Sequence, residues 1–496
     1  MSDLLIINPS GAHGIAGGHA IYGGLGDELI ALEPPLWPRL IAGYARDRGF
    51  SVKIIDAEAE RLDPKQIAAR ILHDVPRLIC IAVFGHQPSA STQQMHGARL
   101  AAQMCKNYAP NIPIIMVGGH VAALPERTLR EEPIDYACNG EGPFTLWALL
   151  DGGVPLNHVR GLVWRDKDGS IKNNPPADLI EMRKLHGNAW DLLLPLSTYR
   201  AHNWQCFGGW PRSPYAAIFT SLGCPYHCSF CCIQSPFSPE INGNRYRMRD
   251  PADVVAEIKM LYDTQGVRTY KFVDEMWLLN KRHVTAICNG IIEAGIGEHI
   301  NCWAYSRIDT THAGDLSLLR RAGIRWLALG IESGSKHVRD GAEKALKNDD
   351  IVGVCNAIDK AGINIIANYI FGLSDDSMDT MQDTLDLAIM LNTPFANFYC
   401  AMAYPGSALY ADAVATGKIL PSSWRGYSQH NDDCRPLDTE HVSAADVLAF
   451  RDNAFRAYFS RPSYLAMMRE RFGAATVGEI EKMLTYRLKR KLLEPA

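Results

Sequence analysis

The sequence predicts an α/β protein in three parts: a doubly wound parallel sheet, an incomplete (β/α)6 barrel of the TIM type, and a small helical domain. Short β-rich runs alternate with helical stretches over about the first 150 residues, the alternation returns between about residues 216 and 406, and helical spacing alone follows. A chain of 496 residues is also longer than one hydrophobic core usually organises. The expected parts are 1–152 for the first sheet, 153–213 for a connector, 214–420 for the barrel and 421–496 for the helices.

The first sheet is expected to present a ligand-binding rim, in the manner of a Rossmann-like fold. Each expected strand ends in small or polar residues, and ligands of open α/β sheets bind outside the carboxyl ends of the strands. The expected strands, with the residues that follow them, are LLIINPS (4–10), SVKIIDAE (51–58), LICIAVFG (78–85), IPIIMVGGH (112–120) and IDYACNGEG (134–142).

This rim is rich in glycine. Glycine lets a bulky planar ligand approach the backbone closely, although the same residues would also suit tight turns between strand and helix. The composition of this domain leaves both interpretations open. The candidate ligand-binding residues of the rim are Ser10, Gly118, Gly119, His120, Gly140, Glu141 and Gly142.

The second alternating region indicates an incomplete barrel, because it contains six consecutive strand and helix units. The connector before it is rich in Pro, Asn and Asp and includes a predicted hairpin. The segment after it spaces apolar residues at i, i+3 and i+4, as amphipathic helices do. The expected barrel strands are AAIFTSLG (216–223), RTYKFVDEM (268–276), INCWAYSRID (300–309), RWLALGIESG (325–334), INIIANYIFGL (363–373) and FANFYCAMAYPG (395–406).

Composition argues against several classes of protein. A net charge of −4 and a pI near 6.5 give no footprint for binding a nucleic-acid backbone. No apolar run is long enough to span a bilayer, and the start MSDLLIINPS lacks the features of a signal peptide, so we expect no membrane contact and a cytoplasmic location. The 13 cysteines are scattered except for one cluster, which in a cytosolic chain indicates metal or redox chemistry.

That cluster lies in FTSLGCPYHCSFCCIQ, residues 219–234. Cys224, Cys228 and Cys231 have the spacing C-x3-C-x2-C directly after the first expected barrel strand. Three thiolates can hold three irons of a [4Fe–4S] cluster and leave the fourth iron open to a small molecule. Zinc is the alternative, but structural zinc usually pairs C-x2-C with a second pair, and the sequence has none. Cys232 would point away from the cluster, so we assign it to packing.

The cysteine motif resembles that of the radical SAM superfamily, in which an aromatic residue, here Phe230, precedes the last cysteine. The resemblance implies a partial barrel whose [4Fe–4S] cluster binds S-adenosylmethionine (SAM) through its open iron. It also implies reductive cleavage of SAM to methionine and a 5′-deoxyadenosyl radical, which abstracts hydrogen from the substrate. An electron donor such as flavodoxin or ferredoxin would supply the electron.

The same resemblance implies SAM-binding residues at the ends of the barrel strands. Asp274 and Glu275 end the second strand, where an acidic residue would meet the amino group of SAM. Arg307 would meet the carboxylate of SAM, and Glu332 would accept its ribose hydroxyls. Structural ion pairing around the barrel mouth is the alternative for these four charged residues.

The N-terminal region resembles the cobalamin-binding domain of one large radical SAM class, on the segments VGGHVAALPERTL (117–129) and NGEGPFTLWALL (139–150). The rim glycines would then receive the corrin and its nucleotide tail, with His120 in contact with cobalamin. Proteins that ligate cobalt through histidine use D-x-H-x-x-G after the first strand, and His13 lacks the aspartate two residues before it. We therefore expect a cobalt whose lower position is empty or water-bound.

Together the resemblances imply a cobalamin-dependent radical SAM methyltransferase that methylates an unactivated carbon of a small molecule. One SAM would recharge cobalamin with a methyl group, and a second would make the radical. The alternative keeps the cofactors but performs a ring formation, rearrangement or oxidation. A third interpretation, a cobalamin-binding or iron–sulfur regulatory module without turnover, conflicts with the intact cysteine motif and the polar barrel mouth.

Overall fold

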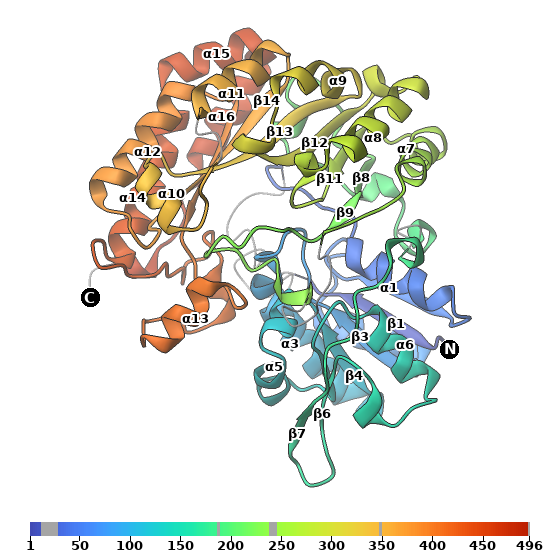
Figure 1. Cartoon of the computed structure of the whole chain (residues 1–496). Helices are drawn as coiled ribbons and strands as arrows, with labels where there is room; N and C mark the ends of the chain where they lie inside the picture. The colour runs from blue at the N-terminus through green and yellow to red at the C-terminus, as the bar shows by residue number, and fades with distance from the viewer. Residues whose placement is uncertain (11–27, 186–188, 238–245, 347–349, 495–496) are drawn as a thin grey trace.

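The computed structural model describes residues 1–10, 28–185, 189–237, 246–346 and 350–494. Within them, two large sheets form the framework, and Figure 1 shows the blue and teal N-terminal sheet below the green and yellow barrel. No helix in the described part of the chain combines the length and the hydropathy that a membrane span needs.

The N-terminal sheet is built from the strands β1 (Leu4–Asn8), β2 (Val52–Asp56), β3 (Leu78–Ala82), β4 (Ile114–Val117), β5 (Tyr136–Cys138), β6 (Leu162–Arg165) and β7 (Ile171–Asn173). Their order is β2-β1-β3-β4-β5-β6-β7, and β1 to β5 run parallel. The predicted doubly wound sheet is thus confirmed. The order reverses between β1 and β3, which creates the switch point at which ligands of such sheets bind. The antiparallel β6–β7 hairpin lies in the segment assigned to the connector and extends this sheet at β5.

Helices cover both faces of this sheet, because residues along a strand alternate between the faces. Leu4 and Ile6 pack against α1 and α6, whereas Leu5 and Ile7 pack against α2 and α3. This burial on both sides explains why β3 is apolar throughout and why β1 is apolar up to its last residue, Asn8. The helices of this domain are α1 (Leu36–Arg46), α2 (Pro64–Asp74), α3 (Ala90–Tyr108), α4 (Gly119–Ala123), α5 (Pro125–Glu131) and α6 (Pro143–Asp151).

The barrel is a sheet of parallel strands: β8 (Tyr215–Ile218), β11 (Thr269–Phe272), β12 (Asn301–Arg307), β13 (Ile324–Glu332), β14 (Asn364–Phe371) and β15 (Phe395–Cys400). They follow one another in chain order, and in the described residues no pairing joins β15 back to β8. This confirms the predicted incomplete (β/α)6 barrel. Its outer helices are α7 (Pro251–Gln265), α8 (Lys281–Glu293), α9 (Leu316–Arg321), α10 (Lys336–Gly341), α11 (Ile351–Lys360) and α12 (Met378–Leu391).

The C-terminal helices are confirmed as well, and they share the hydrophobic core of the barrel. The hydroxyl of Tyr458 donates to the carbonyl of Thr393 at 2.6 Å, and that of Tyr464 donates to the carbonyl of Pro394 at 2.9 Å. Both acceptors directly precede β15, so these helices stabilise the last barrel strand. They are α14 (Ala444–Phe459), α15 (Pro462–Phe472) and α16 (Ala474–Thr485), drawn in orange and red in Figure 1. The helix α13 (Ala408–Ala415) comes before them, in the range expected for the barrel, and belongs to a separate small apolar cluster.

Buried cations join the N-terminal sheet to the barrel. Arg39 of α1 is fully buried and donates to the carbonyl of Ala217 in β8 at 2.8 Å. Lys271 of β11 forms a buried ion pair with Glu33, 2.9 Å away in the segment before α1. Since a buried charge is costly unless it is paired, these contacts favour one arrangement of the two parts.

A second buried ion pair, Arg247 with Glu141, also crosses this interface, and we expect it to matter for stability. Arg247 lies in β10 (Arg247–Met248), which pairs with β9 (Ser221–Leu222) beside the barrel. Replacing Arg247 by Met leaves the carboxylate of Glu141 buried without its cation, so the free energy of unfolding should fall by about 3 kcal/mol. Urea unfolding followed by tryptophan fluorescence measures the loss.

The matched control is Arg130→Met, which breaks an exposed ion pair with Glu126 on α5. Exposed pairs contribute little, so this change should cost about 0.5 kcal/mol or less. Equal losses in the two variants would contradict an interface role for Arg247.

Candidate active site

A cavity of about 400 Å³ lies where the carboxyl ends of both sheets meet, a size within the usual range for ligand sites. Asn8 at the end of β1, Phe84 after β3 and Gly119 after β4 line it from the N-terminal sheet. From the barrel it is lined by residues at the ends of successive strands, among them Glu275, Arg307, Glu332 and Cys400. The rim of the N-terminal sheet and the mouth of the barrel thus border the same cavity.

The three cysteines of the motif all line this cavity. Their loop is held by Gln234, whose side-chain amide donates to the carbonyls of Cys224 at 2.6 Å and Tyr226 at 3.0 Å. The backbone N–H of Cys231 donates to the carbonyl of Cys228 at 3.0 Å. The loop is therefore folded so that three thiols face one space, which is the donor set that an iron–sulfur cluster requires.

Burial raises the pKa of the Cys224 thiol to about 11, so this group would lose its proton only in exchange for a metal. Among the described residues, no three His, Cys, Asp or Glu side chains converge closely enough to hold a single metal ion. A cluster with a separate iron for each thiolate does not require such convergence. Cys232 also borders the cavity, and burial raises the pKa of its thiol to about 12. Its exclusion from the ligand set stays a prediction.

Of the adjacent residues Asp274 and Glu275, Glu275 lines the cavity. Its Oε2 atom is buried and has no hydrogen-bond partner within the described residues. Burial raises the pKa of this carboxyl to about 8. Because buried polar atoms in native proteins are almost always satisfied, an orphaned acceptor at a cavity wall indicates a ligand with N–H or O–H donors.

Asp274, next to it, points the other way and does not line the cavity. Its carboxylate accepts from the N–H of Thr220 at 2.7 Å, from the hydroxyl of Thr220 at 2.6 Å and from that of Ser221 at 2.5 Å. These partners occupy both oxygens. Asp274 therefore holds the turn that leads into the cysteine loop.

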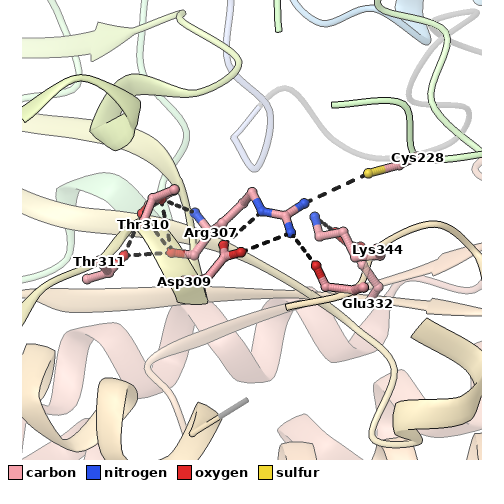
Figure 2. Close-up of polar contacts among 9 residues, drawn as sticks. Cys228, Arg307, Asp309, Thr310, Thr311, Glu332 and Lys344 are labelled. Atoms are coloured by element: carbon pink, nitrogen blue, oxygen red, sulfur yellow. Dashed lines mark hydrogen bonds and ion pairs between the residues drawn. The ribbon is translucent and has the colours of Figure 1, made fainter. Parts of the chain in front are cut away.

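Arg307 lines the cavity close to the cysteine loop, as Figure 2 shows. Its Nε donates to Asp309 at 2.9 Å, and its Nη1 donates to the sulfur of Cys228 at 3.9 Å. The guanidinium also lies over the ring of Tyr226, 4.0 Å from its centroid. Sequence reasoning singled out Arg307 but not Asp309 or Tyr226.

Glu332 is paired with Lys344, whose Nζ lies 2.8 Å from its Oε1 (Figure 2). The backbone of Glu332 has a φ of +67°, and the register of β13 against β14 shifts between Gly330 and Glu332. A Cβ at Gly330 would lie 2.5 Å from Oε1 of Glu332. A left-handed non-glycine residue costs about 1–3 kcal/mol, and such strain gathers at functional sites. Lys344 was not expected from the sequence.

At the N-terminal rim, Gly118 and Gly119 lie next to the cavity for different reasons. A Cβ at Gly118 would lie 1.9 Å from the carbonyl oxygen of Val83, so only glycine allows β4 to end this close to β3. Gly119 lines the cavity itself. His120 turns away, with Nδ1 3.2 Å from the hydroxyl of Thr92, and burial lowers its pKa to about 3.

The other expected rim residues do not line the cavity. Ser10 is buried beyond the end of β1, and His13 lies outside the described residues. Glu141 is engaged by Arg247. β5 is separated from the switch point by β3 and β4, so the residues that follow it lie to the side of the β1–β3 crevice. Those residues are Gly140, Glu141 and Gly142.

The loop after β3 supplies a larger part of the cavity wall than the sequence pattern predicted. Residues 84–89 and Gln93 line the cavity, and the amide of Gln93 donates to the hydroxyl of Tyr404 at 3.1 Å. Phe84 stacks on Trp37, with 4.3 Å between ring centroids. The sequence signal was FGHQPS, a run of small, polar and proline residues directly after an apolar strand.

Fold and site together define an iron–sulfur enzyme that works between two α/β sheets. The family model of the B12 binding domain matches residues 25–150, and that of the radical SAM superfamily matches residues 218–388. The chain therefore belongs to the cobalamin-dependent radical SAM enzymes, whose cofactors are a [4Fe–4S] cluster, SAM and cobalamin.

Individual proteins agree with this. An uncharacterized methyltransferase of Pyrococcus horikoshii is 28% identical over 87% of this chain and 89% of its own length. An anaerobic magnesium-protoporphyrin IX monomethyl ester cyclase of Synechocystis is 30% identical over 64% of this chain and 61% of its own length. The solved structure of the radical SAM methyltransferase TsrM from Kitasatospora setae has a similar fold, with a TM-score of 0.63 at 19% identity, covering 86% of this chain and 81% of that chain.

We predict that Cys224, Cys228 and Cys231 are each required for the cluster and that Cys232 is not. Alanine at any of the first three positions removes a thiolate that faces the cavity, so iron and sulfide content after anaerobic reconstitution should fall to background. The Cys232→Ala variant, made in the same loop, should keep the content of the unaltered protein. Loss of the cluster in this variant as well would overturn the assignment.

Proposed function

We propose that this enzyme transfers a methyl group from SAM, by way of cobalamin, to an unactivated carbon of a small molecule. One observation carries the proposal: the cysteine loop, the orphaned carboxylate of Glu275 and the switch point of the B12-binding sheet all border one cavity. A substrate held there would lie within reach of both cofactors. The methyltransferase from Pyrococcus, which matches nearly the whole chain, supports methylation.

In this proposal the residues of the cavity wall divide the binding of SAM among them. Cys224, Cys228 and Cys231 hold the cluster, and Glu275 accepts from the amino group of SAM. Glu332 and Lys344 offer a carboxylate and an ammonium side by side, which suits the ribose hydroxyls and the carboxylate of SAM. When bound, the cluster and SAM supply a 5′-deoxyadenosyl radical, and cobalamin supplies the methyl group.

The N-terminal wall offers the features that a broad, flat ligand such as a corrin needs. Gly119 leaves the backbone open at the end of β4, and the stacked rings of Trp37 and Phe84 form an apolar surface nearby. We assign cobalamin to this side of the cavity. His120 is engaged by Thr92 and faces away, which supports the expectation that it does not ligate cobalt.

The second candidate is a ring formation, rearrangement or oxidation with the same cofactors. The cyclase from Synechocystis supports it, because that relative is named for ring closure. In either case we propose a flavodoxin or ferredoxin as the electron donor and a small molecule as the substrate. The cytoplasmic location and the lack of nucleic-acid binding remain predictions from composition.

The proposed role of Glu275 predicts a pH dependence of SAM binding. Burial raises the pKa of this carboxyl to about 8, so below that pH it holds a proton and lacks the negative charge that would attract the amino group of SAM. Affinity for SAM should therefore rise as the pH increases toward about 8. Anaerobic equilibrium dialysis with labelled SAM on the oxidised cluster measures this.

Replacing Glu275 by Gln should lower the affinity for SAM at least tenfold at pH 8 and flatten the pH profile. The control is Glu126→Gln on the exposed surface of α5, which should follow the unaltered protein. Retention of both affinity and pH dependence in the Glu275 variant would show that another group receives the amino end of SAM.

Methylation itself predicts that SAM is consumed in two ways. Transfer of its methyl group leaves S-adenosylhomocysteine, whereas reductive cleavage leaves 5′-deoxyadenosine, so both should form in similar amounts with each methylated product. Anaerobic incubation with candidate substrates, methyl-labelled SAM and mass analysis of all products tests this. If 5′-deoxyadenosine accumulates while S-adenosylhomocysteine stays at background and the product gains no methylene mass, the second candidate function replaces the first.

A further inference from the structure

Arg307 is held on several sides before any ligand arrives. Its Nε and Nη2 donate to the two carboxylate oxygens of Asp309 at 2.9 and 3.3 Å. Its Nη2 also donates to the carbonyl of Ala345 at 3.1 Å, which leaves Nη1 directed at the sulfur of Cys228. Figure 2 shows the guanidinium between Asp309 and Cys228. Because the N–H groups of a guanidinium form a rigid fork, fixing two of its nitrogens also fixes the direction of the third.

The backbone around Arg307 is fixed as well. The N–H of Arg307 donates to the hydroxyl of Thr310 at 3.3 Å, and the hydroxyl of Thr311 donates to the carbonyl of Arg307 at 2.8 Å. Tyr226 covers one face of the guanidinium. The side chains of Arg307 and Asp309 are both only 3% exposed, so water competes little for these contacts.

We propose that Arg307 acts on the cluster and not on SAM: it is a positioning residue whose N–H group, aimed by Asp309, donates to the Cys228 thiolate and raises the reduction potential of the cluster. This rests on the proposed function in one respect, that Cys228 ligates the cluster. It departs from the expectation drawn from the sequence, in which Arg307 meets the carboxylate of SAM. Lys344 is the cation available for that carboxylate.

The direction of the effect follows from charge. Reduction adds a negative charge to the cluster, and part of that charge lies on the ligating sulfurs. A hydrogen-bond donor at a sulfur stabilises the reduced form more than the oxidised form, which raises the potential. The effect is large in a site from which water is excluded, because the local dielectric is low.

The test compares Arg307→Gln with the unaltered full-length protein, both reconstituted with the cluster and without SAM. At a fixed ambient potential, the ratio of reduced to oxidised cluster, measured by electron paramagnetic resonance, should fall at least tenfold, which equals about 59 mV for a one-electron couple. The dissociation constant for SAM, measured by anaerobic dialysis on the oxidised cluster, should change by less than about threefold. Iron content is measured first, so failure of the cysteine assignment is recognised separately.

Two further variants complete the experiment. Arg307→Lys keeps the positive charge but cannot bridge Asp309, Ala345 and the sulfur together. The ratio of reduced to oxidised cluster should therefore fall less in this variant than in Arg307→Gln. The Lys variant also replaces the Gln variant in the test if the latter does not assemble the cluster. Arg461→Gln is the matched control, because Arg461 also lies over a tyrosine ring, Tyr458 at 4.6 Å, but far along the chain on the C-terminal helices. It should change neither quantity.

An unchanged ratio in Arg307→Gln would overturn the proposal. A tenfold or greater loss of SAM affinity in that variant would also overturn it, whatever the ratio, because Arg307 would then bind SAM.

Discussion

The ion pairs buried between the N-terminal sheet and the barrel are the constraint on which the rest of the site depends. Lys271 with Glu33 and Arg247 with Glu141 are charges that neither part could bury alone, because each would lack its partner. When the two parts pack together, each charge meets its partner. Separating the parts would break both ion pairs and leave four charged groups without partners. The carboxyl ends of both sheets are therefore held toward one cavity, with the cysteine loop in its wall.

Burial of the side chains that line this cavity governs their chemistry. Burial raises the pKa of Glu275 to about 8 and that of Cys224 to about 11, so both groups favour the protonated form without a ligand. Bound iron and the amino group of SAM would reverse this preference by supplying positive charge or donors. The same low dielectric would strengthen the contact between Arg307 and Cys228. The side chains of the site would therefore reach their charged and paired state only when the cofactors bind.

The pair Asp274 and Glu275 shows how far the sequence alone could be read. Its position at the end of a strand indicated an acidic group at the barrel mouth, and the structure places Glu275 there. Both residues lie beyond the end of β11, and Glu275 lies in a turn, so strand alternation does not decide which of the two faces the cavity. The hydrogen bonds from Thr220 and Ser221 to the carboxylate of Asp274 decide it, because they hold that side chain away from the cavity.

The sequence by itself determined the two parallel sheets, their order along the chain and the cysteine motif, because strand periodicity and C-x3-C-x2-C spacing are local properties. Only the tertiary structure decided which charged groups meet. Lys344 reaches Glu332 across a helix and a turn, and Asp309 aims Arg307 at a cysteine 79 residues earlier in the chain. The residues after β5 lie beyond β3 and β4 from the switch point, and their role in binding cobalamin stays a prediction. Contacts of this kind depend on packing between distant segments, which no local pattern records.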